Sequence, residues 1–290
     1  MPATMRTVAR PLVRSRWHDV DGLRVHSRTT GAGPPVVLVH GYAVSGAYLL
    51  PLAEALAERC TAYVPDLPGH GGSDPPNAAT DIPRLAESLA AWVELLGLER
   101  PGFVANSMGC QIVTELAARW PERAGPLVLI GPTVDPRRRR MRNQLFSLLR
   151  DAAREPTCLV ALSAVDTVRA KPWQLLAAAR SALSDRIEER LPLIEQQTVV
   201  VHAGNDGFVS REWAEQVTAL LPRARLQVFP GEPHAIHYTQ PDLVAGIVWD
   251  LLAEEGWLPV ECPANTSVGR SSKARPMSQA RGHNLAAIVE

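Results

Sequence analysis

The sequence lacks the features that mark membrane proteins, metalloproteins and nucleic-acid-binding proteins. No apolar run approaches the ~20 residues that a membrane-spanning helix requires. The 30 Lys and Arg balance the 30 Asp and Glu, so no overall field attracts nucleic acid or a membrane surface. The cysteines (Cys60, Cys110, Cys158 and Cys262) are far apart and form neither a CxxC pair nor a metal-ligand spacing. We therefore predict free thiols, a cytoplasmic location, and no nucleic-acid, membrane or metal partner.

A secretory signal is also missing. Residues 1–17 contain several arginines but no apolar stretch. An Arg-rich start can mimic an organellar transit peptide, but nothing else indicates an organelle, and we expect a solvated N-terminal arm over residues 1–15. Past Trp257 the composition turns to Ser, Arg, Pro and Gly, which predicts a disordered tail over residues 257–290.

Strand-like and helix-like segments alternate along most of the chain. Residues 16–30 are predicted to form a β-hairpin, because Asp21-Gly22 is a typical tight turn between two alternating stretches. Short runs that are apolar on both faces then alternate with segments of helical spacing. The predicted strands are 36–39, 61–64, 102–105, 126–130, 198–201 and 225–229, and the predicted helices are 47–58, 81–96, 108–120, 211–221 and 241–254. This order predicts an α/β fold, with a mostly parallel sheet and helices on both faces.

The alternation breaks over residues 135–192, which are helical by composition and spacing. This insertion between the sixth and seventh strands predicts a helical lid over the ligand-binding end of the sheet. The core then comprises residues 16–134 and 193–256. The arginine run 137–140 at the start of the insertion is interpreted as a solvated helix face. Several apolar lid residues are candidates to line a pocket, although ordinary packing of lid on core explains them equally well: Leu145, Phe146, Leu149, Trp173, Leu175 and Leu176.

The segment around Ser107 carries the strongest chemical signal. A buried strand runs into Ser107 and a helix begins at once, which is the context of a nucleophile elbow with the motif G-x-S-x-G. Here Gly109 is kept and Ala105 replaces the first glycine. In isolation, a serine that caps an ordinary helix explains the segment equally well.

Two backbone amides are candidates to bind an oxyanion beside Ser107. The first belongs to Met108, the residue after the serine. The second belongs to Tyr42, which follows His40-Gly41 at the end of an earlier buried strand. Acyl transfer requires two such donors aimed at the charge that develops on the carbonyl oxygen.

An acid and a histidine follow two later strands. Asp206 lies in the turn after strand 198–201, and His234 lies in the loop after the last strand. Taken alone, they are an ordinary turn-forming aspartate and a surface histidine. Together with Ser107 they fall in the order Ser, Asp, His, each beyond a strand's carboxyl end, where open α/β sheets bind ligands. The sequence therefore predicts a catalytic triad.

From about Trp17 to Glu254 the chain resembles the α/β-hydrolase superfamily, in a branch of serine esterases and C–C hydrolases with a lid. The matching pieces are Val-Leu-Val-His-Gly-Tyr, Val-Pro-Asp-Leu-Pro-Gly-His-Gly-Gly-Ser-Asp, Asn-Ser-Met-Gly, Leu-Val-Leu-Ile-Gly-Pro, Ala-Gly-Asn-Asp and Pro-His. The resemblance implies the α/β-hydrolase fold, with Ser107 as nucleophile, Asp206 as acid and His234 as base. It also implies Tyr42 and Met108 as oxyanion donors, and no cofactor. Epoxide hydrolases and haloalkane dehalogenases of this fold use an aspartate nucleophile, and Ser107 excludes both.

Two other residues compete for places in the triad. Asp135, after the sixth strand, is the alternative acid in some relatives, but Asp206 fits the strand-end turn better. His237 lies too close to Pro241 for the family pattern, and we interpret it as pocket rim or surface. The remaining polar groups are expected to stabilise their loop or, for the thiol, to pack at a helix start: Asp66, His70, Asp74 and Cys110.

The resemblance implies hydrolysis of a small-molecule substrate, and we expect a small or medium carboxylic ester or lactone. The alternative is a C–C bond hydrolase of vinylogous diketones. The segment Asn106-Ser-Met-Gly is similar to the nucleophile elbow of that group. Those enzymes usually have a glycine-rich oxyanion loop and often a tryptophan after the histidine, whereas this chain has Tyr42 and Ala235 there. Perhydrolase activity on the same triad and a non-catalytic ligand receptor are further hypotheses.

Overall fold

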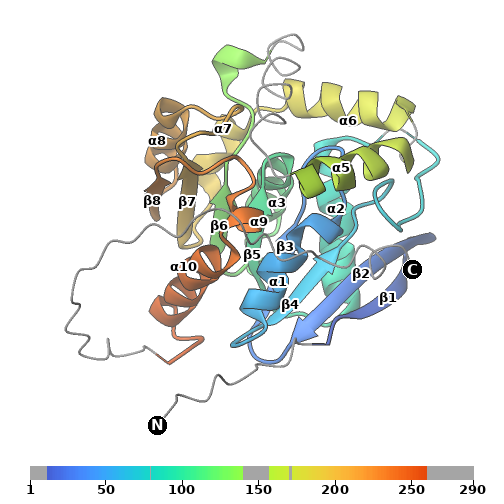
Figure 1. Cartoon of the computed structure of the whole chain (residues 1–290), viewed down its shortest axis with the longest axis horizontal. Coiled ribbons are helices and arrows are strands. Elements are labelled where there is room, and N and C mark those ends of the chain that lie inside the picture. The colour runs from blue at the N-terminus through green and yellow to red at the C-terminus, as the bar shows by residue number, and fades with distance from the viewer. Residues whose placement is uncertain (1–11, 79, 140–156, 170–171, 260–290) are drawn as a thin grey trace.

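The protein is built around one eight-stranded sheet. The computed structural model describes residues 12–78, 80–139, 157–169 and 172–259. The strand order across the sheet is β1-β2-β4-β3-β5-β6-β7-β8 (Figure 1). The strands are β1 (Arg14–Val20), β2 (Leu23–Gly31), β3 (Pro35–Val39), β4 (Thr61–Pro65), β5 (Gly102–Asn106), β6 (Leu127–Ile130), β7 (Thr198–Ala203) and β8 (Ala224–Phe229).

Six of these strands are parallel to their neighbours, from β4 through to β8. The hairpin of β1 and β2 joins this sheet antiparallel, through the pairing of β2 with β4. Because β3, β5, β6, β7 and β8 run the same way, their carboxyl ends meet at one edge. β5 and β6 are buried along their whole length, as expected for parallel strands covered on both faces.

Helices cover both faces of the sheet, as predicted. In Figure 1, α1 and α10 lie on the near face, and α2 and α3 on the far face; the apolar side chains of α8 join the core formed with α2 and α3. The core helices are α1 (Leu50–Leu56), α2 (Ile82–Leu95), α3 (Met108–Arg119), α8 (Arg211–Leu220), α9 (Ile236–Thr239) and α10 (Pro241–Glu254). Asp81 caps α2 as predicted, since its side chain accepts the amide of Arg84.

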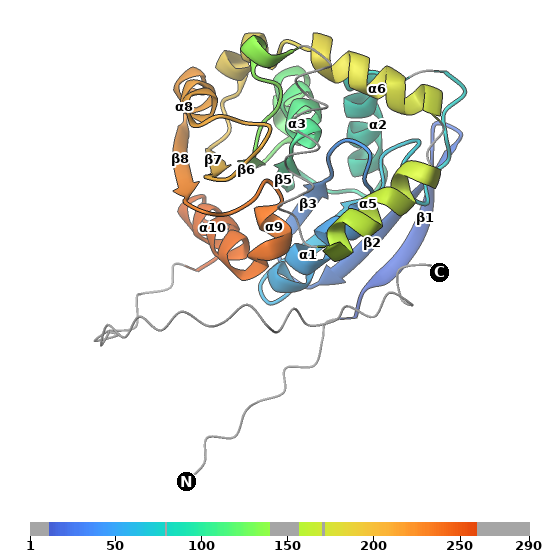
Figure 2. The same ribbon diagram turned by 45° about the horizontal axis from the view of Figure 1, so that its top comes forward.

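The predicted insertion lies between β6 and β7, and its described part is helical. The lid helices are α5 (Thr157–Arg169), α6 (Pro172–Ser184) and α7 (Ile187–Arg190). α6 contacts α2 and α7 contacts α3, and Figure 2 shows α6 beside the end of α2. The insertion is therefore attached to the core helices of the far face.

Four short 3-10 helices complete the described structure: η1 (Gly46–Leu49), η2 (Pro121–Arg123), η3 (Pro136–Arg138) and η4 (Leu191–Leu193). Residues 1–11 and 260–290, which include most of the predicted arm and tail, lie outside the described residues. Trp257 and Leu258 nevertheless pack against the core, so the packed chain reaches past the predicted boundary at residue 256. No helix of the described part is both long and apolar enough to cross a membrane.

Candidate active site

Ser107 occupies a strained turn between β5 and α3. Its backbone has φ 56° and ψ −122°, a conformation that residues other than glycine rarely adopt. Its hydroxyl makes no capping bond to α3, so a serine that merely caps a helix, the alternative kept open from the sequence, is wrong. At Gly109 a Cβ would lie 2.5 Å from the carbonyl oxygen of Val39, which explains why the elbow keeps this glycine. Ala105 is fully buried in the preceding strand.

Asp206 and His234 form a buried pair. His234 Nδ1 lies 2.7 Å from Asp206 Oδ2. The other carboxylate oxygen, Oδ1, accepts the amides of Phe208 and Val209 over 2.7 and 2.9 Å. Because an ionised carboxylate only accepts hydrogen bonds, the proton of a neutral His234 lies on Nδ1, and Nε2 is its basic nitrogen. The ring of Phe208 packs on the imidazole, with centroids 4.8 Å apart.

The strand ends bring this pair to the serine. The amide of Ser107 donates to the carbonyl of Ile130 over 3.0 Å, and Gly131 follows. Gly131 has φ +53°, and a Cβ there would lie 2.8 Å from His234 Cε1 and 2.9 Å from Asp206 Oδ2. On the other side, Asn106 Nδ2 donates to the carbonyl of His234 over 3.4 Å. The structure thus gathers all three predicted residues at the carboxyl edge of β5, β6 and β7.

The loop after β3 lies against the serine. A Cβ on Gly41 would lie 3.1 Å from the Cβ of Ser107, so the backbone that leads into Tyr42 passes directly beside the elbow. Within the described residues, the amides of Tyr42 and Met108 donate to no other protein group. Both are therefore available to an acceptor on a substrate.

Two polar residues that sequence reasoning missed tie this loop to the elbow. The hydroxyl of Tyr48 donates to Asn106 Oδ1 over 2.6 Å and accepts the amide of Gly41 over 3.1 Å. Asn106 also binds the carbonyls of Ile130 and His234. An amide side chain at the end of an otherwise apolar strand was the available signal for Asn106; nothing in the sequence pattern indicated Tyr48.

Asp66 holds the loops after β3 and β4, as predicted for a loop stabiliser. Its buried carboxylate receives His26 Nδ1 at 2.8 Å, the Arg28 guanidinium at 3.1 Å, and the amides of Gly46 and Gly72 at 2.7 and 2.9 Å. Burial alone would raise the pKa of this carboxyl, but the bond from His26 and the charge of Arg28 hold the pKa well below its usual range. The anionic form is therefore the one built into the fold.

His40 and His70 pack beside this loop, with ring centroids 5.0 Å apart. His40 Nε2 accepts the amide of Leu67 over 2.9 Å, so Nδ1 carries the proton and donates to the carbonyl of Gly41. Burial lowers the pKa of His40 to about 3 and also lowers that of His70. Both imidazole rings are therefore uncharged and pack beside the loop. This agrees with the structural role predicted for His70.

The thiol of Cys110 packs at the start of α3. It is fully buried and lies 3.3 Å from the carbonyl of Ala105. Burial raises the pKa of this thiol strongly, so it is protonated and unreactive. The prediction of a packed thiol is confirmed. Cys60 and Cys158 are also free thiols, and Cys262 lies outside the described residues.

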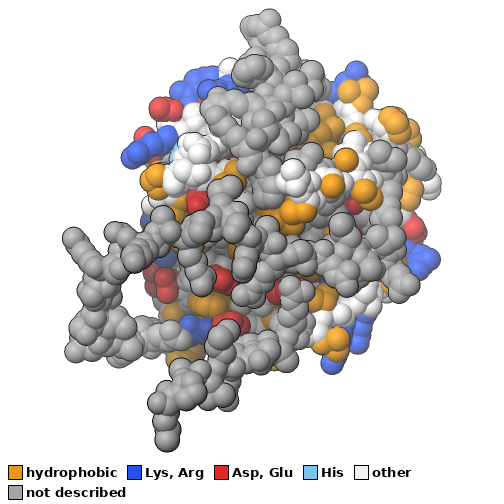
Figure 3. Space-filling model, in the orientation of Figure 1, with side chains coloured by type: hydrophobic (Ala, Val, Ile, Leu, Met, Phe, Trp, Pro, Cys, Tyr) orange, Lys and Arg blue, Asp and Glu red, His pale blue; other side chains and the backbone are white. Residues whose placement is uncertain are grey.

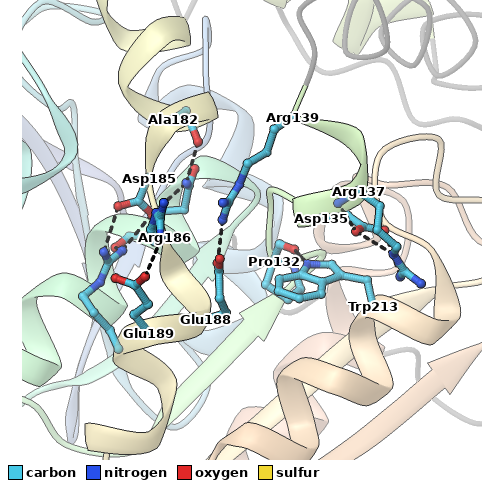
Figure 4. Close-up of polar contacts among 12 residues, drawn as sticks. Pro132, Asp135, Arg137, Arg139, Ala182, Asp185, Arg186, Glu188, Glu189 and Trp213 are labelled. Atoms are coloured by element: carbon cyan, nitrogen blue, oxygen red, sulfur yellow. Dashed lines mark hydrogen bonds and ion pairs between the residues drawn. The ribbon is translucent and has the colours of Figure 1, made fainter.

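Asp135, the alternative acid, is engaged elsewhere. Its carboxylate accepts Arg137 Nε and Nη2, each over 3.0 Å, and caps η3. Figure 4 shows Asp135 and Arg137 turned toward each other. Nearby, Arg139 Nη2 pairs with Glu188 of α7 over 2.5 Å, while Arg140 lies outside the described residues. Within the arginine run, Arg137 and Arg139 are therefore each paired with an acidic side chain.

The interpretation of His237 as pocket rim or surface is wrong. The side chain is fully buried, because the short helix α9 turns it inward against η1 and α1. Its ring meets the ring of Tyr48 edge-on, with centroids 4.6 Å apart. Burial, followed by the proximity of His234, lowers the pKa of His237 to about 3.

Two apolar side chains of lid helix α6 are partly exposed to solvent. Trp173 and Leu176 are 43% and 45% exposed, so packing of lid on core does not explain these two residues. Figure 3 shows apolar side chains gathered where α5 and α6 lie. Leu175 is half-buried, and its carbonyl accepts the hydroxyl of Tyr42 over 3.2 Å. The other candidate pocket residues, Leu145, Phe146 and Leu149, lie outside the described residues.

Polar contacts also attach the lid to the helix that follows the serine. Gln111 of α3 is fully buried, and its Nε2 donates to the carbonyl of Ala182 and to Asp185 Oδ2, each over 2.9 Å. Arg190 pairs with Asp185 over 2.8 Å and with Glu115 over 3.0 Å. Figure 4 shows Ala182 and Asp185 facing this cluster from the end of α6. The base of the lid is therefore fastened to α3.

Several known proteins are similar to this chain in sequence or structure. A pimeloyl-[acyl-carrier protein] methyl ester esterase of Nitrosomonas europaea is 28% identical over 248 residues, which cover 75% of this chain and 95% of that protein. A 2-hydroxy-6-oxononadienedioate/2-hydroxy-6-oxononatrienedioate hydrolase of Comamonas testosteroni is 24% identical, covering 81% and 93%. The enol-lactonase of Burkholderia xenovorans superposes with a TM-score of 0.71 at 19% identity, covering 82% of this chain and all of that chain.

The fold itself is shared with these proteins, and the match to a family model shows the family. The model of the alpha/beta hydrolase family matches residues 36–247, a range that begins in β3 and ends in α10 and so contains the elbow, the lid and the His234 loop. The predicted α/β-hydrolase fold is confirmed. The chain is a hydrolase and belongs to the alpha/beta hydrolase family.

Proposed function

We propose that the protein is a serine hydrolase of small or medium carboxylic esters or lactones, acting through Ser107, His234 and Asp206. The observation that carries the proposal is the convergence of the strained Ser107 turn with the His234–Asp206 pair across Gly131. A relative that covers most of the chain is named as a methyl ester esterase, which favours ester chemistry. No residue of the proposed mechanism requires a cofactor.

The reaction proceeds in two acyl-transfer steps. His234 Nε2 takes the proton of Ser107 as its Oγ attacks the carbonyl carbon, and the amides of Tyr42 and Met108 bind the oxyanion. The tetrahedral intermediate collapses, and the leaving alcohol takes the proton from His234. Water, deprotonated by His234, then attacks the acyl-enzyme and releases the acid. Asp206 holds the imidazole in the required tautomer and stabilises its cation.

A C–C bond hydrolase is the second candidate. The relative from Comamonas testosteroni is named as a hydrolase of a hydroxy-oxo-dienedioate, and Asn106 before Ser107 is similar to the elbow of that group. Against it stand Tyr42, where that group usually has a glycine-rich loop, and Ala235, where it often has tryptophan. Ester or lactone hydrolysis therefore remains the proposed main activity.

A substrate panel tests the proposal. Nitrophenyl esters of increasing acyl length, lactones and a dienone-type diketone are assayed on wild type, Ser107→Ala and Ser184→Ala, an exposed serine of α6. We expect ester or lactone turnover in wild type and Ser184→Ala, and a loss of about 10⁶-fold in kcat for Ser107→Ala. A fluorophosphonate should label Ser107 in wild type and in Ser184→Ala, and should leave Ser107→Ala unlabelled at this position.

Three outcomes would contradict parts of the proposal. Turnover of Ser107→Ala within tenfold of wild type would remove the serine from the mechanism. Preferential cleavage of the diketone would favour the C–C hydrolase. A wild type that neither turns over any substrate nor reacts with the fluorophosphonate would favour a ligand receptor on the hydrolase scaffold.

A further inference from the structure

We propose that Asp166 of α5 is a positioning residue that holds the oxyanion loop, residues 41–46, in its working conformation and so couples the seating of the lid to catalysis. The inference rests on the proposed function, because it takes Tyr42 as an oxyanion donor. Asp166 lies outside the triad and is a lid residue, so it belongs to a part of the chain with no assigned chemistry.

The oxyanion loop does not hold its own shape. Ala43 has φ +58°, in the left-handed region that residues with a Cβ rarely adopt. It follows Tyr42 directly, so relaxation of Ala43 to an ordinary conformation would swing the Tyr42 amide. Contacts from outside the loop must therefore keep the two residues in place.

The core fixes the two ends of this loop. At its start, the amide of Gly41 donates to the hydroxyl of Tyr48 over 3.1 Å. At its end, the amide of Gly46 donates to the carboxylate of Asp66 over 2.7 Å. Both core groups are buried. The segment between them contains the strained residue and the proposed oxyanion donor.

The lid holds that intervening segment. Asp166 Oδ2 accepts the amide of Ser45 over 2.8 Å, and Asp166 is only 6% exposed. The hydroxyl of Tyr42 donates to the carbonyl of Leu175 over 3.2 Å, and the hydroxyl of Thr167 donates to the carbonyl of Ala43 over 3.4 Å. Three residues of the loop thus bind α5 or α6.

Asp166 makes the strongest of these three contacts. Its bond is the shortest, its acceptor is a carboxylate, and it is buried, whereas Tyr42 and Thr167 are exposed. Ser45 and Gly46 therefore present neighbouring amides to two buried carboxylates, Asp166 from the lid and Asp66 from the core. Loss of the lid carboxylate leaves the Ser45 amide without its acceptor, and only the two longer contacts of Tyr42 and Thr167 then join the loop to the lid.

The test compares Asp166→Ala and Asp166→Asn with Val165→Ala, an exposed neighbour on the same helix. For Asp166→Ala we expect kcat to fall about 10- to 100-fold on the best substrate of wild type, with KM within threefold. Asp166→Asn keeps an acceptor and should recover most of kcat. Val165→Ala should match wild type, which separates loss of the contact from general disturbance of α5.

Amide hydrogen exchange gives a readout that needs no activity. Exchange at the amide of Ser45 should accelerate at least tenfold in Asp166→Ala and stay at the wild-type rate in Val165→Ala, with β5 and β6 unchanged in both. Unchanged exchange at Ser45, or a wild-type kcat in Asp166→Ala, would overturn the inference. A wild type inactive on every ester and lactone would instead refute the proposed function, while the exchange result would still report on the contact.

Discussion

Tyr48 donates a hydrogen bond to the side chain of Asn106 over 2.6 Å while it accepts the amide of Gly41 over 3.1 Å. One hydroxyl thereby joins the residue before the serine to the residue before Tyr42. Asn106 extends the link to the carbonyl of His234. The elbow, the oxyanion loop and the histidine loop, which come from distant parts of the sequence, share a single buried network.

Tyr48→Phe removes that hydroxyl with little change in shape. Because it leaves Asn106 Oδ1 and the Gly41 amide without their partner, we expect unfolding free energy to fall by about 1–3 kcal/mol. We also expect kcat to fall about tenfold, because the oxyanion loop loses its fixed start. Tyr63→Phe is the matched control, a partly buried tyrosine of β4 packed near Trp92. Denaturant unfolding and ester kinetics measure both, and equal behaviour of the two variants would contradict the role of Tyr48.

Gly131→Ala tests the contact that brings the triad together. Gly131 and Gly97 both have left-handed φ, +53° and +64°, but a Cβ at Gly97 meets nothing within 4 Å. Each alanine variant should lose about 1–2 kcal/mol from backbone strain. Only Gly131→Ala also displaces His234 and Asp206, so its kcat should fall at least 100-fold while Gly97→Ala keeps wild-type kcat. Similar kcat values for the two variants would show that the contact of Gly131 with His234 and Asp206 is not needed for catalysis.

Replacing either Asp206 or Asp135 by asparagine distinguishes which of the two is the acid of the proposed triad. Asp206→Asn keeps the shape of the side chain but favours the wrong tautomer of His234, and we expect kcat to fall about 10⁴-fold. Asp135→Asn breaks only an ion pair with a largely exposed arginine, and kcat should stay within threefold of wild type. A larger loss for Asp135→Asn than for Asp206→Asn would reverse the assignment.

His237 should make the protein sensitive to acid. Its pKa is lowered from 6.5 to about 3 by burial and by the neighbouring His234, so below pH 6.5 the unfolded chain binds a proton that the folded chain does not. Stability from this residue is complete above pH 6.5 and is lost as the pH falls toward 3. Between pH 7 and pH 5 the loss is about 2 kcal/mol.

His237→Phe removes this titration and retains the packing on Tyr48. Among the described residues neither ring nitrogen of His237 has a hydrogen-bond partner, so the substitution breaks no bond of the protein. The fall in unfolding free energy from pH 7 to pH 5 should be about 2 kcal/mol smaller in the variant. Urea unfolding at the two pH values measures it, and an unchanged difference would contradict the buried neutral state of His237.

Much of the fold could be predicted because its signals are local. Apolar runs such as β5 and turns such as Asp21-Gly22 depend on a few consecutive residues. Boundaries were less accurate, since they depend on packing. Trp257 lies within the predicted tail but contacts the core beside Gly125.

The site residues that could be predicted are those with a typical catalytic side chain directly after a predicted strand. The other residues of the site could not be predicted. Ser107, Asp206 and His234 each follow a strand end, so their meeting could be inferred from topology. Tyr48, Gly131 and Asp166 matter because of the residues they contact in loops distant in sequence. No local sequence pattern indicates such contacts. His237 was misplaced for the same reason, because its burial depends on how α9 turns against η1 and α1.

The bonds between the lid and the oxyanion loop differ in what they demand of the lid sequence. The carbonyl of Leu175, which binds Tyr42, is a backbone group that any residue supplies, whereas the bond to Ser45 needs an acceptor side chain at position 166. Side chains elsewhere on α6 can therefore vary without breaking either bond. Under the proposed mechanism, substitutions on the outer surface of α6 can change which acyl or leaving groups fit, while the two bonds that hold the oxyanion loop are kept.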